Sequence, residues 1–180
     1  MVQKENKILL HSCCGICSGY PISLLKEKGY LPYVYFCNPN LDTSEEFEKR
    51  LEAQKKVCNF FDVELLVEEY DPNEYLQYVK GFETEPERGS RCDKCIELRL
   101  IKTINKAKEL DIKEFATTLI ISPHKNIQKI TEMAERLSYK NEVKYNGINF
   151  RKNDGFLKTN KISKDLGLYR QNYCGCIYAK

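Results

Sequence analysis

The stretch KILLHSCCGIC at residues 7–17 joins an apolar run directly to three cysteines. Lys7–Ser12 has the length and composition of a short buried strand, and the helical pattern that follows it ends at Gly29. The three cysteines therefore fall in the turn that links this strand to its helix. In open α/β sheets, ligands bind outside the carboxyl ends of the strands, which is where such a turn lies.

Outward from this stretch, the chain keeps alternating strand-like and helix-like segments. Further strands are predicted at 33–37, 63–67, 115–121 and within 143–150, because these segments are rich in β-branched and aromatic residues. Helices are predicted at about 43–60, at about 92–110 and within 161–168. A further helix is predicted to begin at residue 71, and another to follow Ser122-Pro123, which would cap it. This order predicts a doubly wound, mostly parallel α/β sheet of about five strands.

Two of the predicted helices carry specific capping signals. Thr43 followed by Glu46 has the spacing of a capping box. In the stretch Asp71-Pro72-Asn73-Glu74, the residue types are typical of a helix start, with Asp71 as the N-cap, Pro72 as the first helical residue and Glu74 as the third. We therefore expect Asp71 to cap a helix near the end of a strand, where its carboxylate is also a candidate ligand for iron.

The composition is that of a globular domain. Of 180 residues, 42% are hydrophobic and 31% are charged, and no apolar stretch reaches the roughly 18 residues that a membrane helix requires. The first residues also lack the apolar core of a signal peptide. We therefore expect a single α/β domain over residues 1–180, with a basic C-terminal segment at 144–180 packed onto it, located in the cytoplasm and without a membrane partner.

Nine cysteines are more than a core of this size needs, and seven of them lie in three close groups. In a reducing compartment, clustered cysteines indicate metal ligation or redox chemistry rather than disulfide staples. The first two groups stand at predicted helix starts, where backbone amides and the helix dipole favour thiolates. The groups are Cys13/Cys14/Cys17, Cys92/Cys95 and Cys174/Cys176.

Seven clustered thiols exceed what one metal centre needs, since four thiolates hold one zinc ion or one iron–sulfur cluster. The surplus indicates a second metal or a redox-active thiol pair. Gly175 gives Cys174 and Cys176 the backbone freedom to close a strained, easily reduced disulfide. The same two thiols are equally suited to metal ligation.

The remaining cysteines and the two histidines carry weaker signals. Cys58 lies within a predicted helix and is interpreted as a packed core thiol. Cys37 ends a predicted strand near the site, and a core position is favoured for it over a functional role. His11 likewise favours a hydrogen-bonded core position over metal ligation. For His124, which follows a predicted strand end, a substrate contact remains open.

Residues 144–180 form a basic segment. They contain eight Lys and Arg against two Asp, a charge of +6, so the rest of the chain sums to −3 within the net charge of +3. Tyrosines and phenylalanines are interleaved with these charges. The pattern is typical of nucleic-acid contact, and a solvated basic face is the equally weighted alternative. No glycine-rich phosphate loop is present, so nucleotide binding has no motif in its favour.

Six stretches together resemble the QueH-type epoxyqueuosine reductases, a cobalamin-independent family of the last step of queuosine formation in tRNA. They are LLHSCCGICSGYP at 9–21, YFCNPNLDTSEEFEKRLEA at 35–53, EYDPNEYLQYVKG at 69–81, RCDKCIELRL at 91–100, ATTLIISPHKN at 116–126 and ISKDLGLYRQNYCGCIY at 162–178. The resemblance covers nearly the whole chain. One departure is Gly15-Ile16, where Ala-Pro is common in that family.

The resemblance implies a fold similar to the adenine-nucleotide α-hydrolase superfamily, with metal ligands in place of the nucleotide loop. It implies a [4Fe-4S] cluster with an adjacent mononuclear iron. It further implies the two-electron reduction of the epoxide of epoxyqueuosine, in the anticodon loop of tRNA, to give queuosine. The electron donor is not identified by any motif.

The resemblance also implies roles for individual residues. The cluster ligands would be Cys13, Cys14, Cys92 and Cys95. Cys17 and Asp71 would be candidates for the extra iron, and Asp71 would then belong to the catalytic centre. Cys174 and Cys176 match the family's C-terminal C-G-C, a redox-active pair or further metal ligands. The residues expected to hold tRNA phosphates are Arg151, Lys152, Lys158 and Arg170.

Two other functions remain open on the residues alone. In the first, the cysteines hold structural zinc in a nucleic-acid-binding module without catalysis. In the second, the chain is a sulfur-transfer enzyme acting on tRNA, a class that also uses clustered cysteines. The absence of a nucleotide-activating loop after the first strand counts against the second.

Overall fold

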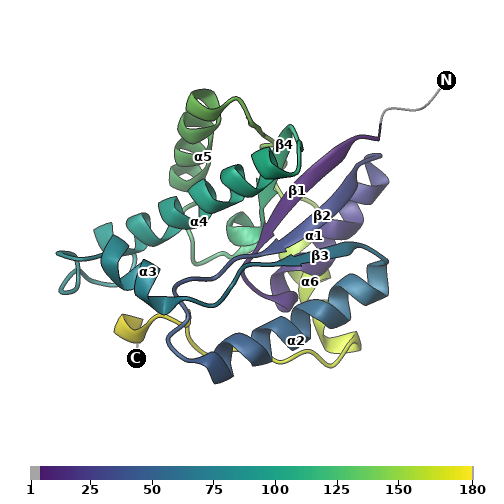
Figure 1. Ribbon diagram of the computed structural model, residues 1–180. Helices are drawn as coiled ribbons and strands as arrows, with labels where there is room; N and C mark the ends of the chain where they lie inside the picture. Colours follow the sequence, from purple (N-terminus) through teal and green to yellow (C-terminus); the bar gives the residue numbers. More distant parts are fainter. Residues whose placement is uncertain (1–4, 180) are drawn as a thin grey trace.

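A central parallel sheet organises the molecule, in a computed structural model that describes residues 5–179 (Figure 1). The strands stand in the order β3-β2-β1-β4-β5, and every pair is parallel. The predicted fold class is therefore confirmed. Lys180, the last residue of the predicted basic segment, lies outside the described residues. The strands are β1 (Lys7–Ser12), β2 (Leu31–Phe36), β3 (Glu64–Val67), β4 (Glu114–Thr117) and β5 (Lys144–Tyr145).

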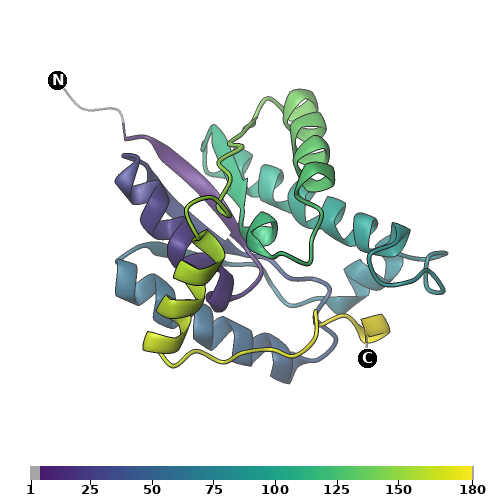
Figure 2. The same ribbon diagram turned by 180° about the vertical axis from the view of Figure 1, so that it is seen from behind.

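Helices cover both faces of the sheet (Figures 1 and 2). Along one face lie α1 (Gly15–Glu27), α2 (Ser44–Phe61) and α6 (Gly155–Asp165), with α1 packed against the other two. The opposite face carries α4 (Ser90–Glu109) and α5 (Ile127–Asn141). The short helix α3 (Pro72–Tyr78) and the 3₁₀ turn η2 (Ile177–Ala179) stand at the end toward which the strands run.

The core lies on the two faces of β1. Ile8, Leu9 and Leu10 are completely buried, since their side chains alternate between the two helical layers. β1 pairs with β2 on one side and with β4 on the other, so the strand order switches there. The loop that follows β1 therefore lies at the topological switch point, where doubly wound folds bind their ligands.

The predicted capping signals are confirmed at α2 and α3. The Thr43 hydroxyl accepts a hydrogen bond from the Glu46 amide at 3.1 Å. The Asp71 carboxylate accepts one from the Asn73 amide at 3.0 Å, with Pro72 as the first helical residue. Each satisfies a backbone donor that the first helical turn leaves without a partner.

Three predicted boundaries are wrong. The strand predicted at 115–121 ends at Thr117, whose hydroxyl accepts from the Leu119 amide and turns the chain into the 3₁₀ helix η1 (Thr118–Ile121). The apolar composition of that segment reflects complete burial, not strand structure. The next helix is capped by Asn126 instead of Ser122-Pro123, because the Asn126 side chain accepts from the Lys129 amide.

The third wrong boundary is the start of the helix predicted within 161–168. α6 begins six residues earlier, at Gly155, and ends at Asp165. A Cβ at Gly155 would lie 1.7 Å from the Phe150 carbonyl oxygen, so this glycine serves a close backbone approach. Glycine is usually a loop signal, which is why the sequence pattern hid the first turns.

After α6, the chain runs beside α2 and returns to the end of the sheet near α3 (Figure 2). Backbone carbonyls of this segment accept hydrogen bonds from α2 and from the β2–α2 loop, which fixes its course. Among residues 5–179, no helix is both long and apolar enough to cross a membrane.

Candidate metal centre

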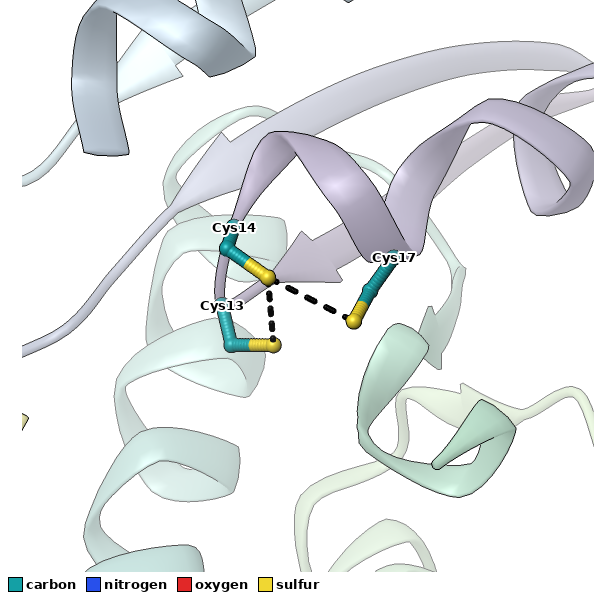
Figure 3. Close-up of side chains that lie close together, drawn as sticks. All are labelled: Cys13, Cys14 and Cys17. Atoms are coloured by element: carbon teal, nitrogen blue, oxygen red, sulfur yellow. Dashed lines mark hydrogen bonds between the residues drawn. The ribbon is translucent and has the colours of Figure 1, made fainter. Parts of the chain in front are cut away.

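The turn between β1 and α1 brings three thiols together (Figure 3). The sulfur atoms of Cys13 and Cys14 are 3.7 Å apart, and those of Cys14 and Cys17 are 3.4 Å apart. All three lie within 4.8 Å of one another, a spacing at which they can hold a metal ion. Cys14 is the N-cap residue of α1, so the predicted position at a helix start is confirmed.

Neighbouring elements hold this turn in place. A Cβ at Gly15 would lie 2.7 Å from the backbone of Ala53, so the glycine allows α1 to start in close contact with α2. The Ser12 hydroxyl donates to the Gln54 side-chain oxygen at 2.6 Å. On the β4 side, the Thr118 hydroxyl accepts from the Cys13 amide at 3.4 Å. The turn is therefore held by α2 on one side and by the 3₁₀ helix η1 on the other.

The three thiols do not ionise alike. Hydrogen bonds from Cys14 and Cys17 hold the pKa of the Cys13 thiol well below its ordinary value. The hydrogen bond to Cys13 raises the pKa of Cys14 to about 12, and that of Cys17 is raised well above its ordinary value for the same reason. Only Cys13 therefore has a lowered pKa, because neighbouring thiols cannot all carry charge, and the predicted effect of the helix terminus stays a prediction. A metal ion that binds here must displace the other protons.

A second group of thiols lies where α3, α4 and the C-terminal segment meet. The Tyr75 hydroxyl is 2.8 Å from the Cys176 sulfur, and both pack with Cys95 in one buried cluster. A hydrogen bond from Cys174, together with those from Tyr75 and the Tyr178 amide, lowers the pKa of Cys176 to about 6. Burial raises the pKa of Cys95. Cys176 is therefore the thiolate of this group.

The C-terminal thiols rest on a buried ion pair of α2. Arg50 and Glu46 are 3% and 6% exposed, and the Arg50 Nε donates to the Glu46 carboxylate at 2.7 Å. The Arg50 guanidinium also donates to the carbonyls of Tyr173 and Cys174, both at 3.0 Å. The Gly175 carbonyl accepts from the Asp42 amide at 2.8 Å. These bonds fix the backbone on the N-terminal side of Cys176.

Gly175 fits this seat because it has no side chain. Its φ is +100°, and a Cβ would lie 2.2 Å from Leu41 and 3.1 Å from the Arg50 guanidinium. Gln171 lies four residues before Gly175, and its side chain forms a hydrogen bond with Cys14 that lowers the pKa of that thiol. The hydrogen bond with Cys13 raises the pKa of Cys14 by more. The C-terminal segment therefore touches the Cys13–Cys14–Cys17 turn as well as the Tyr75–Cys95 cluster.

Arg99 lies between the two groups of thiols. It is 6% exposed, and its Nη2 donates to the Cys95 sulfur at 3.3 Å. Burial disfavours its charge, but the charges of Cys95, Cys13 and Cys174 outweigh burial and raise the pKa of Arg99. We call these residues together the thiol site: the three thiols of the β1–α1 turn, the three thiols of α4 and the C-terminal segment, and Arg99. Its members are Cys13, Cys14, Cys17, Cys95, Cys174, Cys176 and Arg99.

The predicted ligands are only partly brought together. Within residues 5–179, Cys13, Cys14 and Cys17 are the one group of three or more potential ligands that meets the 4.8 Å spacing. Cys17 thus lies with Cys13 and Cys14 and not beside Asp71. Cys92, near the start of α4, accepts from the Arg88 amide at 3.2 Å. Asp71 is exposed and caps α3.

The residues predicted to be structural are buried in the core. Cys58 packs in the main cluster and accepts from the Gln54 amide group at 3.4 Å. Cys37 is completely buried, and burial raises its pKa to about 12. His11 is also completely buried, with one ring nitrogen 2.9 Å from the Thr117 hydroxyl and the other 3.0 Å from the Cys37 carbonyl oxygen. His124 is exposed in the turn before α5.

Of the four predicted tRNA contacts, Arg151 differs from the others. Its guanidinium donates to the carbonyls of Ile120 and Lys125, both at 2.6 Å, and to that of Ser122, so it ties the loop after β4. Burial lowers its pKa. The other three side chains are exposed: Lys152 beside it, Lys158 on α6 and Arg170 beyond α6.

Sequence reasoning missed Arg99, Tyr75 and the Glu46–Arg50 pair. A signal was available for Arg99, which follows Cys95 by four residues and therefore shares its helix face. Glu46 and Arg50 have the same spacing, but nothing in the sequence indicates that their pair is buried. Tyr75 could not be found, because its partner Cys176 is 101 residues away.

Comparison with known proteins places this architecture in one family. The family model described as "Epoxyqueuosine reductase QueH" matches residues 8–180. The chain is 38% identical over 178 residues to the epoxyqueuosine reductase QueH of Streptococcus pyogenes serotype M1, covering 96% of this chain and 69% of that protein. It is 34% identical over 175 residues to that of Thermotoga maritima, covering 96% of this chain and 89% of that protein.

A solved structure shares the fold at low identity. It is the U34-tRNA thiolase NcsA from Methanococcus maripaludis with its [4Fe-4S] cluster, with a TM-score of 0.61 and 16% identity. The match covers 99% of this chain and 63% of that chain. At this identity the likeness shows the fold alone. The match to the family model, together with that to the curated relatives, decides the assignment: the chain belongs to the epoxyqueuosine reductase QueH family.

Proposed function

We propose that this chain is an epoxyqueuosine reductase, which converts the epoxide of epoxyqueuosine in tRNA to the cyclopentene of queuosine. Membership of the QueH family over residues 8–180 is the observation that carries the proposal. The reaction consumes two electrons and two protons and releases the epoxide oxygen as water. A site rich in thiols, with thiolate character at Cys13 and Cys176, supports reductive chemistry.

The donor set of the thiol site fits a metal–thiolate centre. Three sulfur atoms meet at one helix start, and the nearby buried cation, Arg99, suits a centre of negative charge. As cluster ligands we propose Cys13, Cys14, Cys92 and Cys95. When bound, a [4Fe-4S] cluster with an adjacent iron would supply single electrons and a Lewis acid for the epoxide oxygen.

For the adjacent iron we propose Cys17 and Asp71 as ligands. Two of the proposed ligands now have other partners, because Cys92 accepts from the Arg88 amide and Asp71 caps α3. Neither hydrogen bond excludes metal binding, because a ligand thiolate or carboxylate keeps lone pairs that accept a backbone N–H. The structure supports Cys13, Cys14 and Cys17 most directly, since their sulfur atoms already converge.

The C-terminal thiols are suited to hold and release protons and electrons. We propose Cys174 and Cys176 as a redox-active pair. Oxidation of two thiols to one disulfide releases two electrons and two protons, which matches the reduction of one epoxide to an alkene and water. The Tyr75 hydroxyl, 2.8 Å from the Cys176 sulfur, stabilises the thiolate that this exchange requires.

The tRNA substrate would lie along the basic segment. We propose phosphate contacts for Lys152, Lys158 and Arg170, whose side chains are exposed. Arg151 acts by shaping the loop that its guanidinium holds. The target base must leave the anticodon stack, which costs little in a single-stranded loop. Arg170 also lines a surface hollow of about 350 Å³ on α6, with Leu157, Asn160, Lys161, Lys164 and Asp165.

Salt dependence tests these contacts. Each lost phosphate contact lowers the affinity for tRNA and reduces the slope of log K against log salt. We expect Lys152→Ala to do both with an unchanged fold, whereas Arg151→Ala also loosens residues 120–125. An unchanged slope for both variants would remove the basic segment from the tRNA interface.

A reconstitution assay tests the proposed activity. The chain is loaded anaerobically with iron and sulfide, mixed with tRNA that carries epoxyqueuosine and a chemical reductant, and the nucleosides are analysed by mass spectrometry. We expect queuosine from the wild type, none from Cys13→Ser, and wild-type amounts from Cys58→Ser, which replaces a core thiol. A colourless protein that retains zinc and forms no queuosine contradicts the proposal, and an ATP requirement indicates sulfur transfer instead.

A further inference from the structure

Arg99 is a buried cation whose guanidinium donates a hydrogen bond to sulfur. Its Nη2 donates to the Cys95 sulfur at 3.3 Å, and it is 6% exposed. Its Nε is buried and has no hydrogen-bond partner among the described residues. A buried charge without compensation is costly, so a native structure that keeps one must supply opposite charge nearby.

Other buried or half-buried cations of the described residues have oxygen partners. Arg50 binds the Glu46 carboxylate and two carbonyls. Lys102, one turn after Arg99 on α4, binds the carboxylates of Glu68 at 2.9 Å and Glu74 at 2.7 Å. For Arg99, no carboxylate within residues 5–179 forms an ion pair at 4.0 Å or less. Arg99 is therefore unusual in this chain, because sulfur is its partner.

The groups that act on Arg99 are the thiols of the site. Cys95, Cys13 and Cys174 come from three separate segments, and each favours the charged guanidinium against the effect of burial. The guanidinium thus lies within electrostatic reach of all three parts of the thiol site.

We infer that Arg99 is the resident counter-charge of the thiol site, a positioning residue whose guanidinium binds the Cys95 sulfur and offsets the negative charge of a metal–thiolate centre. The inference rests on the proposed function in assuming that the thiols bind metal. Its physical basis is that hydrogen bonds and positive charge near sulfur ligands stabilise the more negative, reduced state of a centre. Arg99 therefore raises both metal affinity and reduction potential.

Binding of Co²⁺ to the metal-free 180-residue chain tests the inference without any cluster. Arg99→Gln removes the charge and keeps a hydrogen-bond donor, whereas Arg99→Lys keeps the charge. We expect Co²⁺ affinity, read from thiolate-to-cobalt absorption, to fall about tenfold or more in the first and to stay close to wild type in the second. Lys102→Gln is the matched control, since it removes a cation of the same helix that carboxylates already balance.

A second readout is the midpoint potential of the reconstituted cluster, which we expect to become more negative in Arg99→Gln than in Arg99→Lys. If a variant is less stable, the rise in Tm that Co²⁺ produces reports the same affinity. Equal Co²⁺ affinities of wild type and Arg99→Gln would overturn the inference. A wild type that binds Co²⁺ in the expected order but forms no cluster and no queuosine would overturn the proposed function and leave the role of Arg99 standing.

Discussion

Replacement of Gly175 by alanine tests how firmly the C-terminal thiols are seated. Gly175 has a φ of +100°, which side-chain-bearing residues avoid at a cost of about 1–3 kcal/mol. Its new Cβ would also lie 2.2 Å from the buried Leu41 side chain and 3.1 Å from the Arg50 guanidinium. Overpacking of this kind costs a further 1–3 kcal/mol or so. The sum is about 2–6 kcal/mol.

Gly81→Ala is the matched control. Gly81 has a similar φ of +90°, but a Cβ there would meet nothing within 4 Å. It therefore carries the backbone cost, about 1–3 kcal/mol, without the overlap. The difference between the two variants isolates the contact of residue 175 with Leu41 and Arg50.

Two measurements follow the perturbation. Urea unfolding gives the loss of global stability, and the rate of Cys176 alkylation, read by mass spectrometry, reports local release of the segment. Cys176 is 5% exposed in the folded protein. If the C-terminal segment detaches from Leu41 and Arg50 before the domain unfolds, Cys176 will be alkylated much faster in Gly175→Ala than in Gly81→Ala. The reasoning is refuted if Gly175→Ala matches Gly81→Ala in both measurements.

Three further perturbations test other parts of the structure. Arg50→Met leaves Glu46 buried without its ion-pair partner and should lower the free energy of unfolding in urea by about 3–5 kcal/mol. The control is Lys49→Met, which removes the exposed ion pair of the neighbouring residues Lys49 and Glu45 and should leave the urea midpoint unchanged. Thr43→Ala removes the α2 cap and should cost about 1 kcal/mol, seen as a lower urea midpoint at the same slope. Arg151→Ala should speed hydrogen exchange at 120–126 while β1 keeps its protection, because the guanidinium bonds to three carbonyls of that loop.

The alternation of strands and helices could be predicted because it rests on local patterns. Thr43 and Asp71 cap their helices as their spacing indicates, since capping involves residues only two or three positions apart. The strand predicted through 121 failed because apolar, β-branched residues fill a completely buried 3₁₀ helix as readily as a strand. In a short segment, complete burial and strand structure favour the same apolar, β-branched residues.

The sequence predicted which cysteines belong to the candidate site better than it predicted how they are arranged in space. The Cys13–Cys14–Cys17 turn could be placed because one strand–helix junction holds all three thiols. The contacts of Cys176 with Tyr75, and of the C-terminal backbone with Arg50, join residues more than 100 positions apart. Such contacts depend on the complete tertiary fold, so no local sequence pattern predicts them.

The place of β1 in the sheet has a consequence for the order in which the chain folds. β1 pairs with β2 after one short helix, but its other neighbour, β4, begins only at Glu114. Until that strand is available, the edge formed by Leu9–His11 has no partner, and Thr118 cannot support the cysteine turn. Unpaired, apolar strand edges recruit other chains. We therefore expect a partly folded chain to aggregate first through β1, the strand that leads into the cysteine turn.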